Sequence, residues 1–386
     1  RDCRPQSSQE PENPRSEYNR KGAGTMSVMN HVEERYLRLG LVLAGARSRV
    51  RRLIAEESGR GFPTDLLCDR GVPTALLETA TKLARAEART TVERIEAAGW
   101  QWLIPGDSQY PELLAATADP PLGLFVRGRI EERPTVAIVG SRKATPYGLQ
   151  VARLLGEELG KAGVVMVSGM ARGVDEAAHR GALAAGGPSW AVWGTGPDRI
   201  YPPEHGKLAE KLAATGALIT EYPPGTPPRR HHFPERNRIL SGIARAVVVI
   251  EAAARSGALI TARLAMEEGR EVLAVPGNIF SELSVGPNTL LRVGARPLLT
   301  PRDLFEAIGC EPRCETEPSP DEGLLCFIKA GEAVTADEIA MRAEIAVSEV
   351  LGNLLALELA GEVSRGADGK FSRLRISRAT ISRDGV

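Results

Sequence analysis

The sequence predicts an α/β fold, in which a doubly wound and mainly parallel sheet follows an N-terminal α-helical module and precedes a C-terminal winged helix. Two observations lead to this fold class. Short apolar runs alternate with helical stretches through the middle of the chain, as in parallel sheets covered by helices on both faces. The C-terminal part has the pattern of three helices followed by a hairpin. We therefore expect a Rossmann-like central domain.

Composition restricts the class of protein. The 386 residues suffice for two or three domains, with 42% hydrophobic and 25% charged residues. A formal net charge of zero excludes a uniformly basic nucleic-acid coat but allows a local basic patch. No apolar run approaches the ~18 residues of a membrane helix, and the start of the chain lacks a hydrophobic signal core. We expect a cytoplasmic protein without a membrane partner.

Cysteine, histidine and aromatic content argue against two further classes. The five cysteines contain no C-x-x-C pair, and the five histidines are scattered, so we expect no metal site. Aromatic residues make up only 4% of the chain, which argues against a surface built mainly of base-stacking rings.

The N-terminal part is expected to hold a disordered tail and a helical module. Residues 1–25 are polar, rich in Pro, Ser, Arg and Glu, and show no periodicity. From His31 onward, apolar residues recur at helical spacing, with breaks at Gly and Pro. We assign 26–120 to this module and to the connection that follows it.

Residues 121–309 are expected to form the Rossmann-like core. The expected strands are 135–139, 164–167, 190–193, 217–220, 246–250 and 272–275, and the expected helices centre on 147–161, 175–185, 204–215, 237–243 and 258–268. The strands are continuously apolar, so we expect the sheet to be buried on both faces.

The last part of the chain is expected to be a linker, 310–321, a winged helix, 322–377, and a tail, 378–386. Thr335 and Glu338 form a capping box at the start of its second helix. The hairpin and tail carry Arg365, Lys370, Arg373, Arg375, Arg378 and Arg383. Three interpretations of these bases stay open. They could form the main contact with DNA, they could form a secondary contact with duplex DNA or with a partner protein, or they could simply be solvated residues of the wing.

Glycine, serine and arginine recur where the predicted strands end. The candidate binding residues are Gly140, Ser141, Arg142 and Lys143 after the first strand, Ser168, Gly169 and Arg172 after the second, Arg236, Asn237 and Arg238 after the fourth, and Ser256 and Gly257 after the fifth. Ligands of open α/β sheets bind beyond the carboxyl ends of the strands. Glycine allows close backbone approach, and helix N–H groups and arginine suit phosphate, although ordinary turn geometry would also explain the glycines.

No reactive group accompanies these anion donors. We find no Ser–His–Asp or Cys–His grouping, Walker motif, G-x-G-x-x-G or pair of carboxylates at a credible site. The adjacent His231 and His232 fit polar lining better than a metal site. Many anion donors without a nucleophile or base predict a binder of a polyphosphate backbone, and hence of a single nucleic-acid strand. We expect no catalytic residue and no cofactor.

The ordered set of motifs resembles the DNA-processing protein A family, DprA, also called Smf. The motifs are Val139-Gly-Ser-Arg142, Ser168-Gly-Met-Ala-Arg-Gly-Val-Asp175, Gly194-Thr-Gly196, Phe233-Pro-Glu-Arg-Asn-Arg238 and Ser256-Gly-Ala-Leu-Ile-Thr261. Their order and spacing match across about residues 100–300. The helical module, which is SAM-like, and the winged helix resemble the family's three-part architecture.

The resemblance implies a DNA-binding mediator and not an enzyme. Family members bind single-stranded DNA through the Rossmann-like domain and dimerise through it. They load the RecA recombinase onto incoming strands, including strands coated by single-strand-binding protein, during natural transformation.

The resemblance also implies roles for particular residues. Arg142 would be the leading phosphate contact, and the basic pocket would extend to Arg236 and Arg238. Backbone or hydroxyl donors would come from Gly140, Ser141, Ser168 and Gly169. Leu290, Leu291 and Val293 are candidates for the dimer surface, and they are equally well explained as ordinary core residues.

A different class of function stays as the alternative. The fold is similar to that of nucleoside monophosphate phosphoribohydrolases, which would make the chain a Rossmann-type nucleotide-binding enzyme. Those enzymes are expected to carry a Pro-Gly-Gly-x-Gly-Thr segment followed by Glu. In this chain only Pro276-Gly277-Asn278 and Ser256-Gly257 are partly similar to that segment, so the alternative ranks second.

Overall fold

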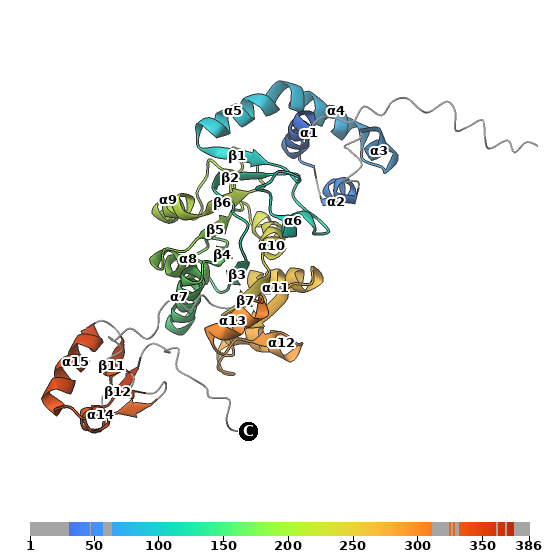
Figure 1. Ribbon diagram of the computed structural model, residues 1–386. Helices are drawn as coiled ribbons and strands as arrows, with labels where there is room; N and C mark the ends of the chain where they lie inside the picture. The colour runs from blue at the N-terminus through green and yellow to red at the C-terminus, as the bar shows by residue number, and fades with distance from the viewer. Residues whose placement is uncertain are drawn as a thin grey trace, which may run out of the picture. The chain divides into compact units, whose positions relative to one another are not determined.

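The chain forms two compact units, Arg1–Arg313 and Cys314–Val386 (Figure 1). The computed structural model describes residues 31–46, 48–56, 64–310, 324–325, 327–328, 332–359, 362–366 and 369–373. The predicted tails, 1–25 and 378–386, and nearly all of the predicted linker lie outside the described residues. Within the described residues, no helix is both long enough and apolar enough to cross a bilayer.

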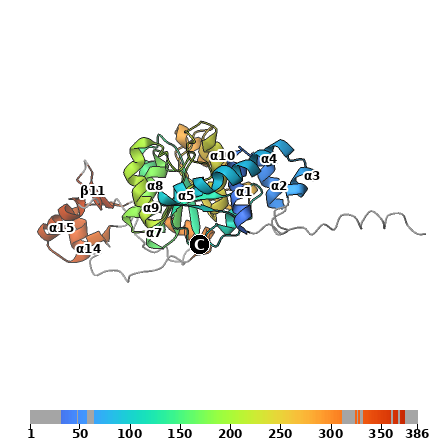
Figure 2. The same cartoon turned by 90° about the horizontal axis from the view of Figure 1, so that it is seen from above.

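The first unit begins with a group of helices. These are α1 (His31–Leu43), α2 (Ser48–Glu56), α3 (Thr64–Asp69), α4 (Thr74–Leu83) and α5 (Arg89–Ala97), and a π-helical turn, η1 (Ala84–Ala88), joins the last two. Leu37, Leu41, Ile54 and Leu77 pack in a small apolar core of their own. Figures 1 and 2 show α1 to α4 grouped at one end of this unit.

A single mixed sheet of nine described strands forms the centre of the first unit. The strands are β1 (Trp100–Leu103), β2 (Leu124–Gly128), β3 (Thr135–Val139), β4 (Val165–Ser168), β5 (Ser189–Val192), β6 (Ala217–Thr220), β7 (Ala246–Val249), β8 (Glu271–Ala274) and β9 (Arg296–Pro297). Their order is β1-β2-β6-β5-β4-β3-β7-β8-β9. β1 and β2 pair antiparallel with each other, and β2 pairs antiparallel with β6, whereas the remaining pairs are parallel.

The six predicted strands correspond to β3 through β8, which confirms the α/β fold class. β1, β2 and β9 were not predicted. β1 and β2 lie in a turn-rich segment rich in Pro and Gly, and β9 has two residues, one of them proline. Their strand conformation comes from pairing with the edges of a sheet that the other strands had already defined.

Helices cover both faces of the sheet. They are α6 (Glu112–Ala115), α7 (Pro146–Lys161), α8 (Val174–Ala184), η2 (Pro203–His205), α9 (Gly206–Thr215), α10 (His232–Ile243), α11 (Gly257–Glu267), η3 (Glu282–Ser284), α12 (Val285–Arg292) and α13 (Pro301–Ala307). Along β3, Val136 and Ile138 face α7 and α8, whereas Ala137 and Val139 face α10 and α11. Figure 1 shows α7, α8 and α9 on one side of the strands and α10 and α11 on the other.

The second unit is a winged helix. Its described elements are β10 (Ala333–Val334), α14 (Ala336–Ala343), α15 (Val347–Leu359), β11 (Val363–Arg365) and β12 (Phe371–Arg373), with strand order β10-β12-β11. The predicted capping box is present, because Glu338 N donates to Thr335 Oγ1 at 3.2 Å and Thr335 N donates to the Glu338 carboxylate at 2.8 Å. The predicted first helix, 324–328, lies partly outside the described residues.

Candidate nucleic-acid interface

The predicted site loops meet at the carboxyl edge of the parallel strands. The chain runs outward from β3 through β4, β5 and β6, then returns to add β7 and β8 on the other side of β3. Such a reversal of strand order opens a crevice where ligands of α/β sheets bind. The loop after β3, with Gly140, Ser141, Arg142 and Lys143, therefore stands beside the loop after β7, with Ser256 and Gly257.

Exposed cations gather in the loops of this edge. Arg142 is exposed, and its guanidinium lies over the ring of Phe233, 5.3 Å from the ring centre. Lys143, Arg229 and Arg230 are also exposed, and none of these four has an ion pair among the described residues. Arg172 is exposed but donates to the Glu204 carboxylate at 2.6 Å. The loops after β3 and β6 thus carry positive charge that forms no ion pair with any residue in the described part of the chain.

Two carboxylates of the chain occupy the backbone donors nearest the strand-order reversal. Glu251, 5% exposed, accepts from Thr145 N at 2.8 Å and from Thr145 Oγ1 at 2.5 Å, directly at the start of α7. Asp175, 7% exposed, accepts from Gly169 N at 3.1 Å and from Ala171 N at 3.3 Å. Helix N-termini and glycine loops at this position bind phosphate in nucleotide-binding folds, but here internal anions already hold these groups.

Ser168 likewise has an internal partner. It is fully buried, and its Oγ donates to the carbonyl oxygen of Ile138 at 2.6 Å. Ser256 Oγ caps α11 by accepting from Ala258 N at 3.3 Å, and Ser141 Oγ accepts from Lys143 N at 3.1 Å. Of the predicted donors, Ser168 and Gly169 are therefore engaged inside the protein, while Gly140 and Ser141 lie beside the exposed Arg142.

Arg236 lies in the interior, where it joins α10 to the ends of two strands. It is 4% exposed, and its guanidinium donates to the carbonyl oxygen of Gly169 at 3.2 Å and also to that of Val192. A Cβ atom on Gly169 would lie 2.6 Å from the guanidinium, so this close approach requires glycine. Burial lowers the pKa of Arg236 to about 10, although the nearby Asp175 carboxylate opposes the shift. Asn237 is also buried, and its amide donates to Gly257 O at 3.2 Å.

Arg238 belongs to a charge network that connects α10 with the helical module. It pairs with Glu221 and donates to the backbone carbonyl of Asp119 at 2.8 Å. The Asp119 carboxylate accepts from Arg51 Nε at 2.9 Å and from Ser48 Oγ at 2.7 Å, both on α2. Two arginines and two acids balance one another, so Arg238 is a positioning residue for α10 in this structure and adds no free charge to the edge.

We expect Asp119→Asn to lower the free energy of unfolding by about 2–3 kcal/mol at neutral pH, because the arginines lose a charged acceptor. Burial alone would raise the pKa of Asp119, but the hydrogen bond from Arg51 and the charges of Arg238 and Arg51 outweigh burial and lower it. A lowered folded-state pKa means that this stabilisation is present above the unfolded pKa, roughly 4, and is lost as pH falls through the folded value.

Urea unfolding of wild type and variant from pH 7 to pH 3 measures this difference, which should shrink below about pH 4. Glu210→Gln is the matched control, since Glu210 pairs with Arg127 at the surface and should contribute less than about 1 kcal/mol. A difference that stays constant down to pH 3 would contradict an ionised Asp119.

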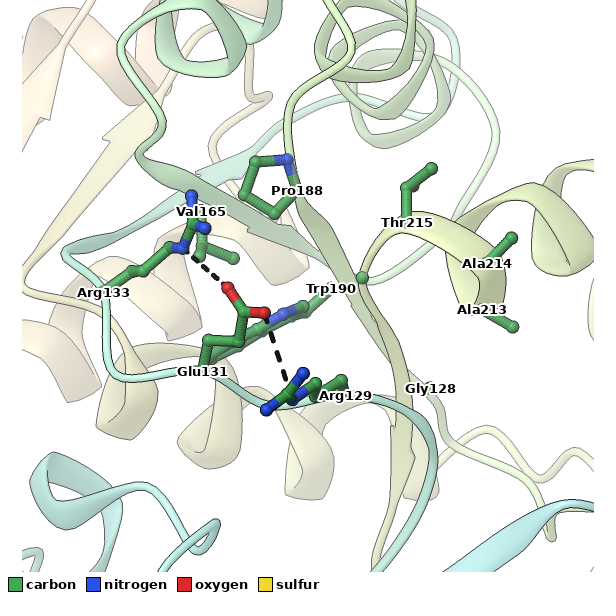
Figure 3. Close-up of a pocket in the computed structure, with 11 residues that line it drawn as sticks. Gly128, Arg129, Glu131, Arg133, Val165, Pro188, Trp190, Ala213, Ala214 and Thr215 are labelled. Atoms are coloured by element: carbon green, nitrogen blue, oxygen red, sulfur yellow. Dashed lines mark ion pairs between the residues drawn. The ribbon is translucent and has the colours of Figure 1, made fainter.

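A separate cavity of about 310 Å³ lies at the opposite edge of the sheet, where β4, β5 and β6 begin. Figure 3 shows Glu131 between two arginines, with ion-pair distances of 2.8 Å to Arg133 and 4.0 Å to Arg129. The two arginines that line the cavity share the Glu131 carboxylate, and the cavity lies at the opposite edge of the sheet from the strand-end loops. It is therefore distinct from the candidate interface.

His179 and His232 have hydrogen-bond partners inside the protein. No group of three or more His, Cys, Asp or Glu there is placed to hold a metal ion. His179 is fully buried and hydrogen-bonds to Ser189 Oγ at 2.8 Å, and burial lowers its pKa to about 3. His232 Nδ1 donates to Gly194 O at 3.1 Å and its ring stacks on Tyr222, while His231 is exposed.

Aromatic rings line the same edge as the cations, which the low aromatic content did not predict. Tyr201 is partly exposed, and its ring centre lies 5.3 Å from that of Phe233. Tyr222 stacks on His232 at 4.2 Å, and Tyr147, at the start of α7, is 52% exposed. Each of these aromatic residues comes soon after a strand in the sequence. That position could have predicted that the rings lie at the carboxyl edge of the sheet.

The three candidate dimer residues separate into core and surface. Leu290 is 8% exposed, and Leu291 packs against the same core cluster. Val293, at the end of α12, is 64% exposed. Ile279 and Phe280, in the loop after β8, are exposed as well. Of the three candidate residues, only Val293 is thus largely exposed.

Comparison with known proteins identifies the family. The model described as "DNA recombination-mediator protein A" matches residues 101–309, and the DprA winged helix domain matches residues 311–369. Protein Smf of Escherichia coli is 41% identical over 290 residues, which cover 71% of this chain and 77% of that protein. The putative DNA processing protein DprA of Mycobacterium tuberculosis is 38% identical over 325 residues, covering 78% and 83%.

A solved structure agrees with the sequence matches. The X-ray structure of DNA processing protein A from Streptococcus pneumoniae is 33% identical and superposes with a TM-score of 0.64, covering 70% of this chain and 97% of its own. It extends the agreement from motifs to the arrangement of the sheet and its helices. On the family match, the relatives and this fold, the chain belongs to the DNA recombination-mediator protein A family, DprA/Smf.

Proposed function

We propose that the protein is a non-catalytic mediator of recombination that binds single-stranded DNA at the carboxyl edge of its sheet. The observation that carries this proposal is the group of uncompensated cations there, Arg142, Lys143, Arg229 and Arg230. Cations without a nearby acid attract phosphates and release counterions on binding. Gly140 and Ser141 flank Arg142, and the exposed Gly257 leaves open space on the neighbouring loop.

Other predicted site residues act through the scaffold in this proposal. Arg236, Asn237 and Arg238 hold α10 against the strand-end loops and so position Phe233, which precedes them on the same helix. Arg172 shares its charge with Glu204, and a phosphate would compete with that carboxylate for its guanidinium. The contact set is therefore smaller than the predicted set, and the remaining residues support it.

The preference for a single strand follows from the rings at the edge. Phe233 lies beside Arg142 and Tyr201 lies beside Phe233. Unpaired bases expose faces that stack on such rings at about 1–3 kcal/mol per base. Duplex DNA hides these faces in its own stack, which leaves it only the phosphate contacts. Stacking also tolerates any base, so we expect weak sequence preference.

The family supports a place for this binding in recombination. We propose that the protein works in the cytoplasm during natural transformation, where it protects incoming strands, including strands that carry single-strand-binding protein, and loads RecA onto them. We also propose a homodimer that uses the surface around Val293, with Ile279 and Phe280, because these exposed apolar side chains would be buried by a second copy.

No observation favours the alternative of a nucleotide-cleaving enzyme. Glu251 and Asp175 occupy the backbone donors that would hold a nucleotide phosphate at the strand-order reversal. A nucleotide phosphate could reach these donors only by displacing a buried carboxylate. That displacement costs free energy, because the carboxylate loses its hydrogen bonds.

A binding titration tests the proposal. A fluorescent single-stranded oligonucleotide and its matched duplex are titrated with the full chain at several salt concentrations. We expect tighter binding of the single strand, with a log–log salt slope of about 0.7 per neutralised phosphate. Equal affinity for both forms, or a slope near zero, would overturn the proposal. Release of free base from nucleoside monophosphates, measured by chromatography, would support the enzyme instead.

A further inference from the structure

The helix that occupies the recognition position of the winged helix carries no cation. α14 and α15, joined by the turn 344–346, form a helix-turn-helix, whose second helix enters the DNA major groove in DNA-reading proteins. Between Thr335 and Leu359 there are five acids and one base, and α15 itself contains Glu349 and Glu358 but neither Lys nor Arg. The single base, Arg342, is held by Glu332 at 2.8 Å.

The same helix carries a second apolar line next to the one that faces the core of the domain. Val350 and Leu354 are fully buried in the core of the domain. Beside that buried line, Val347, Leu351 and Leu355 are 38%, 46% and 58% exposed, and their spacing of four residues places them in one line along the helix. A surface helix normally confines its large apolar side chains to the face that packs on the core, so a second and exposed line of them indicates a contact.

α14 contributes one more apolar side chain and further acids. Met341 is 78% exposed, and Asp337 and Glu338 are exposed in the first turn of the same helix. Glu344, the end residue of α14, and Glu349 are exposed as well. The exposed apolar residues Val347, Leu351 and Leu355, called the α15 ridge below, therefore lie on a helix-turn-helix whose charged residues are mostly acids.

We propose that the α15 ridge is a docking surface for a separate polypeptide, an amphipathic segment whose apolar side chains are flanked by Lys or Arg. Charge decides between the possible occupants. DNA phosphates would meet Glu349 and Glu358 at the position where a recognition helix needs cations. A second copy would place two acidic ridges face to face. A basic amphipathic segment buries the leucines and pairs with the acids.

Among the described residues, the exposed bases of this domain other than Arg342, which pairs with Glu332, lie on the wing. Arg365 and Lys370 are exposed on the wing, with the Arg365 guanidinium 5.6 Å from the centre of the Phe371 ring. Charge is thus segregated within the domain, bases on the wing and acids around the α15 ridge.

Selection from a random-peptide display library against the full chain tests the proposal, with counter-selection against the double variant Leu351→Ser, Leu355→Ser. The enriched peptides should combine apolar residues at helical spacing with Lys or Arg. In fluorescence anisotropy, the double variant should bind a selected peptide at least about tenfold more weakly, because it lacks the two leucines that the bound peptide would bury. Glu358→Lys, three residues after Leu355 on the same helix, should also weaken binding, and Val32→Ser, an exposed site on α1, should not.

Both leucines are exposed, so the double variant should unfold at the wild-type temperature, which thermal unfolding checks. An empty selection, enrichment of acidic peptides, or equal binding to the double variant would overturn the proposal. Loss of duplex binding in the double variant with unchanged peptide binding would assign the surface to DNA. Self-association that only the double variant abolishes, measured by sedimentation, would assign it to a second copy.

Discussion

Arg142→Ala is expected to weaken single-strand binding by about tenfold to a hundredfold, because a charged contact with a phosphate is worth roughly 1.5–3 kcal/mol. Arg142 follows β3 at the strand-order reversal and has no ion pair among the described residues, so its charge is available to the strand. The loss should be similar for all base sequences, since a phosphate contact carries no sequence information. The log–log salt slope should fall by about 0.7.

Arg133→Ala is the matched control for this measurement. Arg133 is 43% exposed at the opposite edge of the sheet and pairs with Glu131, so its removal should leave binding nearly unchanged. Anisotropy titrations of wild type and both variants at several salt concentrations make the comparison. Equal losses for the two arginines would indicate a diffuse charge effect and would contradict a defined contact at Arg142.

Arg236→Leu is expected to lower the free energy of unfolding by roughly 3–5 kcal/mol, the effect of removing one member of a buried pair. The variant leaves the carbonyl groups of Gly169 and Val192 without their donor and leaves the buried Asp175 without a nearby cation. Arg180→Leu removes an exposed arginine that pairs with Glu176 one helical turn away, and should cost less than about 1 kcal/mol.

The measurement also distinguishes the two roles considered for Arg236. Urea unfolding gives the free energy, and anisotropy at low temperature gives the single-strand affinity of the folded variant. A positioning residue predicts a large loss of stability with an affinity reduced less than in Arg142→Ala. A variant of unchanged stability that no longer bound the strand would restore Arg236 to the phosphate contacts.

The central strands could be predicted because their signal is local. β3 through β8 are continuous apolar runs between helical segments, and burial on both faces of a parallel sheet requires such runs. β1 and β2 have no comparable signal. Their conformation depends on antiparallel pairing of Gly128 with Ala217, far away along the chain, and on a sheet edge that exists only in the folded unit.

The cations of the site also differ in how far the local sequence predicts their environment. Arg142, Arg236 and Arg238 look alike in the sequence, as arginines beside glycine loops or within a basic run. Which face of α10 turns inward is decided by its packing on the sheet, and that packing buries Arg236. The acids that balance Arg238 come from distant segments, Asp119 and Glu221, and no local pattern announces them.

The sequence by itself determined the α/β class, the central strands, the capping box of α14 and the edge of the sheet at which the candidate loops lie. Each of these depends on residues close together along the chain or on the general geometry of parallel sheets. Only the tertiary structure decided which donors remain available: Glu251 and Asp175 fill two sets of backbone donors, and Arg236 is buried. Availability is a property of burial and of partners brought together by folding, and therefore it is not encoded in any single segment.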